Sequence, residues 1–160
     1  MKTSAEWAKA LNLEPHVEGG YYRQVVKSSE RVREGERALY TSIYFVLEAD
    51  NPSHFHRLTC DEIWYYHAGQ PLTVHMIHPD GRYETVDLGL DPEQGQHLSY
   101  VVPQGTIFGS TVEEGYALVS CLCAPGFEYD DFELFSRQDL LDQYPDHAAI
   151  IERLTREDEA

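Results

Sequence analysis

Short runs of apolar and aromatic residues, separated by glycine, proline and charged residues, recur along most of the chain. Many of these runs alternate between apolar and polar positions, which is the periodicity of a β-strand with one buried face. The segments that this pattern predicts as strands are 21–27, 40–47, 53–57, 61–69, 72–78, 82–88, 97–102, 106–110 and 116–124. Such short strands, separated by turn residues and not by helices, predict an all-β sandwich or barrel, and we favour a jelly roll.

Helical patterns occur only towards the two ends of the chain. Thr3 and Glu6 match the S/T-x-x-E signature of a capping box, which predicts a short helix over about 3–11. Two further short helices are expected within about 136–154. The expected boundaries are 1–160 for a single domain and about 20–125 for its barrel core.

The composition limits the partners that the protein can have. The 160 residues carry a formal net charge of −16, from 28 acidic and 12 basic residues. Such a chain lacks the basic surface that binding to nucleic acid or to an anionic membrane requires. No apolar run reaches the length of a membrane-spanning helix. We therefore expect a small-molecule ligand, with no nucleic acid and no membrane as partner.

The cysteines bear on the compartment of the protein. There are three, Cys60, Cys121 and Cys123, and this odd number without a secretory signal predicts the reducing cytoplasm. Cys121 and Cys123 are separated by one residue on an apolar strand. We interpret them as small core residues, because free cysteine is commonly buried and no second cysteine pair completes a metal site.

The strongest candidate for a functional site lies within residues 53–69. His54 and His56 are two residues apart, so on a strand they share one face. Glu62, Trp64 and Tyr66 likewise share one face of the strand that returns after a short turn. If the two strands pair, two imidazoles and a carboxylate point into one cavity beside aromatic walls.

Three interpretations of this group are open. Two neutral imidazoles and a carboxylate suit one divalent metal ion such as Fe, Mn, Ni or Zn, and a 2-His-1-carboxylate set is typical of non-haem iron sites. Without a metal, His56 is a candidate general acid or base that is oriented by Glu62 or by Asp61. The third interpretation is a hydrogen-bonded polar cluster that does no chemistry.

The other histidines are weaker candidates. His67 has the parity of the outer strand face and is expected to point outward. His75 is interpreted as a partly buried histidine with satisfied hydrogen bonds, and His16 as a surface or structural residue. Gly19 and Gly20 are expected to form a bend at the start of a strand.

The order of motifs along the chain resembles that of the cupin superfamily. The first cupin motif is matched by His54-x-His56, Glu62 and Gly69, and the start of the second by Gly95 and Pro103-x-Gly105. A further set resembles one subgroup, small single-domain cupins of unassigned function. Its members here are Glu18-Gly19-Gly20-Tyr21, Thr41-x-Ile43-Tyr44-Phe45, Ser53-x-Phe55-His56-Arg57, Asp61-Glu62-Ile63-Trp64, Val102-Pro103-x-Gly105 and Ala124-Pro125-Gly126-Phe127.

This resemblance implies a double-stranded β-helix, the RmlC-like jelly-roll cupin barrel, which is usually a homodimer with a pocket at the barrel mouth. By position it places His54, His56 and Glu62 at three of the four metal-ligand sites of the superfamily. Phe108 stands where the fourth ligand, a histidine, is expected, so a weak three-ligand site or a metal-free pocket is implied. Superfamily members include metal-dependent dioxygenases, decarboxylases and isomerases, metal-free sugar-nucleotide epimerases, and storage proteins without activity.

Our leading hypothesis is a small-molecule-binding cupin with isomerase- or epimerase-like activity on a polar, carbohydrate-derived ligand. In this hypothesis His56 transfers a proton and Glu62 orients it. The residues expected to bind the ligand are Arg23, Tyr44, Arg57, Trp64, Tyr66 and Phe108, with the two arginines as partners for an anionic group. The alternative is a metal-dependent oxygenase or lyase that uses His54, His56 and Glu62, and the third is a non-catalytic binding protein.

Overall fold

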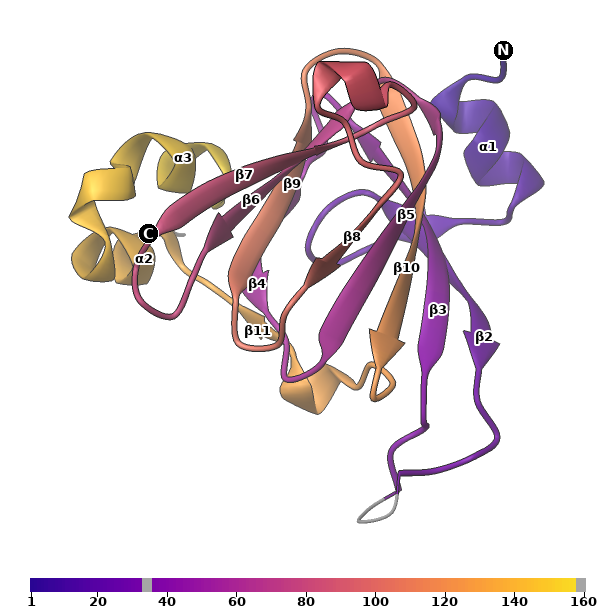
Figure 1. Ribbon diagram of the computed structural model, residues 1–160, viewed down its shortest axis with the longest axis horizontal. Helices are drawn as coiled ribbons and strands as arrows, with labels where there is room; N and C mark the ends of the chain where they lie inside the picture. The colour runs from indigo at the N-terminus through magenta and orange to yellow at the C-terminus, as the bar shows by residue number, and fades with distance from the viewer. Residues whose placement is uncertain (33–35, 158–160) are drawn as a thin grey trace.

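The computed structural model describes residues 1–32 and 36–157, and its strands form two antiparallel sheets that face each other (Figure 1). The first sheet contains, in spatial order, β1 (Glu14–Pro15), β2 (Tyr21–Lys27), β3 (Thr41–Glu48), β10 (Tyr116–Ala124), β5 (Asp61–Gly69) and β8 (Ser99–Val102). The second contains β11 (Glu133–Leu134), β4 (Ser53–Arg57), β9 (Ile107–Val112), β6 (Leu72–Ile77) and β7 (Tyr83–Leu88). Strands far apart in sequence, such as β3 and β10, are neighbours, which is the interleaved order of a jelly roll.

The α-helices lie outside the two sheets. They are α1 (Ser4–Ala10), α2 (Arg137–Gln143) and α3 (Ala148–Arg153), and the 3₁₀ turns are η1 (Pro92–Gln94), η2 (Tyr129–Asp131) and η3 (Pro145–His147). Helices α2 and α3 lie beside the second sheet (Figure 1), and the residues that join them to it are Phe55, Ile77, Ile107, Leu140, Ile151 and Leu154. Within 1–32 and 36–157, no helix has the length and apolar character needed to cross a membrane.

The space between the sheets is filled by a hydrophobic core with aromatic side chains at its centre. Trp64 is fully buried, and its ring centroid lies 6.0 Å from that of Phe45 and 6.4 Å from that of Phe108. These rings come from β5, β3 and β9, so they tie the two sheets together. Burying large aromatic side chains is a major source of stability for a barrel of this size.

The predicted fold class is confirmed, with helices towards both ends of an all-β core. Each predicted strand is present, and its boundaries differ by no more than two residues from those expected. The predicted capping box is also present, because the Thr3 hydroxyl accepts a hydrogen bond from the Glu6 amide and the Glu6 carboxylate accepts one from the Thr3 amide. Strands β1 and β11 were not predicted, since two residues are too short to show a periodicity.

Gly19 and Gly20 form the expected bend. Their φ angles are 117° and 75°, and glycine is favoured at both positions because other residues rarely adopt a positive φ. A Cβ atom at Gly19 would lie 1.9 Å from the backbone oxygen of Pro52. Gly105 also has a positive φ, 82°, but a Cβ atom there would meet nothing within 4 Å.

We expect Gly19→Ala to lower the free energy of unfolding by roughly 3 kcal/mol or more, because backbone strain and a backbone clash add together. Gly105→Ala is the matched control, and strain alone should cost it about 1 kcal/mol. Urea unfolding of both variants measures the difference. Equal losses in the two variants would show that the contact with Pro52 does not matter.

Candidate functional site

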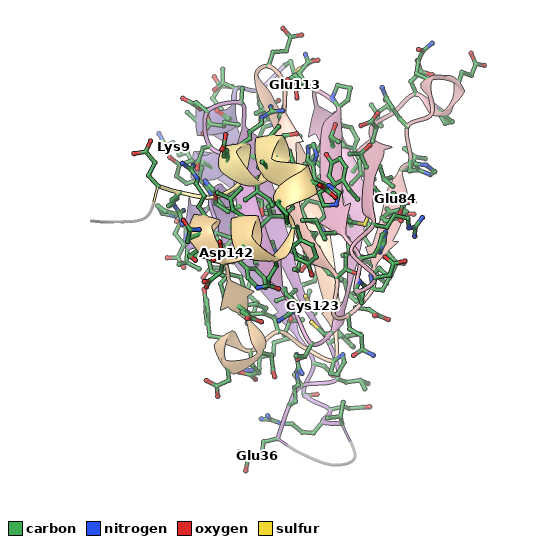
Figure 2. All side chains as sticks on the ribbon, turned by 90° about the vertical axis from the view of Figure 1, so that its left-hand side faces the viewer. Lys9, Glu36, Glu84, Glu113, Cys123 and Asp142 are labelled. Atoms are coloured by element: carbon green, nitrogen blue, oxygen red, sulfur yellow. The ribbon has the colours of Figure 1, made fainter. Side chains whose placement is uncertain are left out.

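A cavity of about 220 Å³ opens on the inner face of the six-stranded sheet. Its lining residues combine acidic, thiol and aromatic side chains and are His16, Glu18, Tyr22, Gln24, Thr41, Ile43, Leu58, Glu62, Cys121, Cys123, Phe127 and Tyr129. Cys123, which is labelled in Figure 2, lies towards the end of the barrel where Glu36 is found. The cavity thus lies at one end of the barrel, as expected for a pocket at its mouth.

Glu18 occupies the centre of the polar part of this cavity. It is held there by the turn before β2, in which the His16 amide donates to the Gly20 carbonyl and the Gly19 amide donates to the His16 carbonyl. The Ser53 hydroxyl donates a hydrogen bond to one carboxylate oxygen, Oε2. The same oxygen lies 3.4 Å from Nε2 of His56, and the other oxygen lies 3.4 Å from Nε2 of His16. One carboxyl group therefore lies between two imidazoles.

The two imidazoles present opposite tautomers to Glu18. The backbone N–H of Glu18 donates to Nδ1 of His16 at 3.1 Å, so in neutral His16 the proton is on Nε2, which faces the carboxylate as a donor. In His56 the Nδ1 atom lies 2.7 Å from the His54 carbonyl oxygen, which can only accept. Neutral His56 therefore carries its proton on Nδ1, and its Nε2 faces Glu18 as an acceptor.

Glu62 supplies the second carboxyl group of the cavity from β5. It is buried, and the Cys123 thiol donates to its Oε2 atom at 3.4 Å. Burial, reinforced by the nearby Glu18 carboxyl, raises the pKa of Glu62 to about 7. A carboxyl with this pKa is partly protonated at neutral pH, so it can either donate or accept a proton.

Burial also shifts the other groups around Glu18. It raises the pKa of Glu18, and it lowers the pKa of both His16 and His56, in each case as the largest cause. Burial likewise raises the pKa of Cys121 well above its ordinary value. At neutral pH the imidazoles are therefore uncharged, and the carboxyl group of Glu62 carries an exchangeable proton.

His56 and His54 do not point the same way, because β4 has a bulge between Ser53 and His56. His54 uses its Nδ1 to donate to the backbone carbonyl of Glu18 at 2.6 Å, and it is not among the lining residues of the cavity. His56 packs against the rings of Phe108 and Phe132, with centroid distances of 4.2 and 5.4 Å.

The predicted ligand set of His54, His56 and Glu62 therefore does not assemble. Over residues 1–32 and 36–157, no group of three or more His, Cys, Asp or Glu side chains could hold a metal ion. The residues present do not fit a resident divalent metal. The reason is local: the bulge removes the strand alternation on which the expected pairing of the two histidines depended.

The residues predicted to bind a ligand separate into two groups. Trp64, Tyr66 and Phe108 point inward as expected, but they fill the hydrophobic core and do not line the cavity. Tyr66 donates its hydroxyl proton to the Gln70 carbonyl at 2.9 Å. Phe108 contributes by supporting His56.

The predicted residues Tyr44, Arg23 and Arg57 lie away from the cavity. Tyr44 lies between the inward-facing Ile43 and Phe45, and its ladder partner is Arg23, so both belong to the outer face of the sheet. Arg57 is paired with Glu133 at 2.7 Å. An anionic ligand in the cavity would therefore not meet either arginine.

Among the alternatives, Asp61 does not replace Glu62, because it is exposed and accepts from the Gln104 amide at 2.9 Å. His67 is exposed, as predicted. His75 has both nitrogens engaged, with Tyr83 at 2.6 Å and Thr111 at 2.8 Å, as expected of a satisfied histidine.

His16 and Glu18 are the important residues that the sequence did not identify. His16 was expected to be a surface or structural residue, yet it is buried and lines the cavity. Cys121 and Cys123 are buried as predicted, but they also line the cavity. The only signal for Glu18 was its place in the Glu18-Gly19-Gly20-Tyr21 motif, whose glycines allow the turn that carries it inward.

Comparison with known proteins identifies the family of this chain and two solved structures of the same fold. Residues 5–135 match the model of the family described as "Cupin superfamily (DUF985)". Protein SO0799 from Shewanella oneidensis is 48% identical, with a TM-score of 0.95 over 99% of this chain and 100% of that chain. A hypothetical protein from Leishmania major is 44% identical, with a TM-score of 0.93 over 98% and 100%.

Two other similarities are more distant. The uncharacterized protein YML079W of Saccharomyces cerevisiae is 28% identical over an alignment of 146 positions that covers 79% of this chain and 72% of the yeast protein. Oxalate decarboxylase from Bacillus subtilis is 16% identical with a TM-score of 0.58, over 90% of this chain and 37% of that chain. The likeness to oxalate decarboxylase is one of fold alone.

Proposed function

Because this chain belongs to the cupin superfamily, in the family DUF985, and because its barrel holds two carboxyl groups in one small cavity, we propose that it binds a small polar molecule and moves a proton on it, as isomerases and epimerases do. The observation that carries the proposal is the position of Glu18 between an imidazole that donates and an imidazole that accepts. Such an arrangement gives the carboxyl group a hydrogen-bond partner in both states, since a donor stabilises its ionised form and an acceptor its protonated form.

The proposed reaction is proton transfer next to a carbonyl group. Ionised Glu18 removes a proton from the carbon beside the carbonyl, while protonated Glu62 gives its proton to the carbonyl oxygen, and an enediol forms. Transfer of the proton from Glu18 to the former carbonyl carbon, with loss to Glu62 of the hydroxyl proton on the first carbon, completes an isomerisation. Delivery of a proton from solvent to the opposite face of the first carbon gives the epimer, while the hydroxyl proton on the former carbonyl oxygen returns to Glu62 and Glu18 releases its proton to solvent. No atoms are gained or lost in either case.

The role that we propose for His56 differs from the one expected from the sequence. His56 does not line the cavity, and its Nε2 meets Glu18, so it acts on the ligand only through that carboxyl group. We therefore assign His56 as a positioning residue that accepts or returns the proton of Glu18. His16 holds the other carboxylate oxygen as a donor.

The test is hydrogen exchange between solvent and ligand. The protein is incubated in ²H₂O with aldoses, ketoses and nucleotide sugars, and deuterium at the carbon beside the carbonyl is followed by NMR. Exchange that depends on the protein supports the proposal. Binding without exchange for every ligand would instead favour the non-catalytic alternative.

Two matched variants distinguish His56 from His54 in this assay. His56→Gln should lower the exchange rate at saturating ligand by roughly tenfold to a hundredfold with little change in KM, because the proton partner of Glu18 is lost. His54→Gln keeps a donor for the Glu18 carbonyl and should stay within about threefold of the parent. Equal losses in both variants, with metal present in the untagged protein, would favour the metal-dependent alternative.

A further inference from the structure

The charged side chains that line the cavity are acidic. Glu18 and Glu62 are its acidic side chains, and no lysine or arginine among the described residues lines it. Arg37 lies near the mouth but is engaged by the Gly126 carbonyl at 2.5 Å and the Asp131 carboxylate at 3.1 Å. Its Nη2 atom has no partner, but that atom is covered by protein and Arg37 is not part of the lining.

The mouth of the cavity is aromatic. The rings of Phe127 and Tyr129 meet edge to face at 4.9 Å, and the rings of His16 and Tyr22 do so at 4.4 Å. The Tyr22 and Tyr129 hydroxyl oxygens lie 3.3 Å apart, which joins the two pairs. Aromatic faces above buried carboxyl groups attract cations and disfavour anions.

From this lining we infer that the cavity selects a small polar molecule with an amino group, such as an amino sugar or amino polyol, whose ammonium is held by Glu62 and whose carbon skeleton lies among the mouth rings. This inference rests on the proposed function in taking the same cavity as the ligand site. It uses the ionised form of Glu62 and the proposed reaction uses the protonated form, and both forms are populated near neutral pH because burial raises the pKa of Glu62 to about 7. Its volume of about 220 Å³ is below the roughly 300–1,000 Å³ of pockets for drug-sized ligands, so a single sugar-sized ligand fits the inference.

The lining offers a direct test of this charge preference. Gln24 is exposed on β2 and lines the cavity, whereas its neighbour Arg23 belongs to the outer face of the same strand. Gln24→Lys places a positive charge at the mouth without changing the core. Arg23→Gln is the control, because it changes charge at the adjacent position on the opposite face.

The probes are glucosamine, glucose and glucuronate, with binding measured by isothermal titration calorimetry at pH 7.5. For the parent and for Arg23→Gln we expect glucosamine to bind at least about tenfold more tightly than glucose, and glucuronate not to bind. Both Gln24→Lys and Glu62→Gln should lose the advantage of glucosamine. Tighter binding of glucuronate, equal binding of all three probes, or binding of none would overturn the inference.

These outcomes separate the inference from the proposed function. If neutral sugars exchange hydrogen but the amino group gives no advantage in affinity, the charge preference is wrong and the acid–base function stands. If glucosamine binds as expected and no ligand exchanges hydrogen, the acid–base function is wrong and the charge preference stands.

Discussion

Replacement of Glu18 by glutamine is expected to reduce the rate of proton exchange by roughly 10²–10⁴-fold, the range typical for removal of a general acid–base group. Glutamine has nearly the same shape and keeps a hydrogen-bond partner for the Ser53 hydroxyl, so the cavity should retain its form. What it removes is the titrating proton between the imidazoles of His16 and His56. The measurement is deuterium incorporation at saturating ligand, followed together with ligand affinity.

Glu133→Gln is the control for this substitution. Glu133 forms an exposed ion pair with Arg57 outside the cavity, and its loss should change the exchange rate by no more than about twofold. Unfolding of the Glu18→Gln variant should occur at no lower temperature than that of the parent, since a buried carboxyl group is removed. Full activity in Glu18→Gln would contradict the assigned role of this residue.

The fold could be predicted because its signal is local and repeated. In β5 every second residue faces the core, and the sequence alone places Glu62, Trp64 and Tyr66 together on that inner face. The structure confirms this arrangement. Alternation of this kind requires only that the strand be regular, and β5 is regular along this segment, since its register shift comes after Tyr66.

The site could be predicted only in part, because it depends on irregular backbone. The bulge in β4 separates His54 from His56, and a bulge leaves no reliable mark on the hydrophobic pattern. His16 and Glu18 precede β2, and they reach β4 through a turn with two glycines of positive φ. Sequence periodicity describes neighbours along a strand, and these contacts join residues about 35 to 40 positions apart.

The contact between Glu18 and His56 also changes how the two acidic residues of the cavity are interpreted. Glu62 was expected to orient His56, but the carboxylate oxygen that lies 3.4 Å from the His56 Nε2 belongs to Glu18. Glu62 instead accepts a hydrogen bond from a thiol, with 3.4 Å between its Oε2 atom and the Cys123 Sγ atom. A thiol is a weak donor, so it offsets little of the cost of ionising a buried carboxyl group. Ionisation of Glu62 should therefore lower the stability of the folded state.

Glu62→Gln is expected to stabilise the protein in a strongly pH-dependent way. The pKa of Glu62 rises from 4.5 to about 7 on folding, so between these values the folded state binds more protons than the unfolded state. The contribution of Glu62 to the free energy of unfolding is therefore present in full below pH 4.5 and falls as the pH rises to about 7, by roughly 3 kcal/mol in all. Glutamine cannot ionise and escapes this loss.

Urea unfolding of the parent and of Glu62→Gln, at several pH values between about 5 and 8, measures this effect as a difference between the two proteins. The difference is the informative quantity, because the buried histidines act in the opposite direction: the pKa of His75 falls to about 4, so its contribution is lost as the pH falls below its unfolded value of 6.5. The advantage of the variant should grow by roughly 2–3 kcal/mol from pH 5 to pH 8. Glu113→Gln, which changes an exposed carboxylate, should show no such growth. A constant difference between parent and Glu62→Gln would mean that Glu62 is ionised throughout this range, and it could then not donate the proton that the proposed reaction requires.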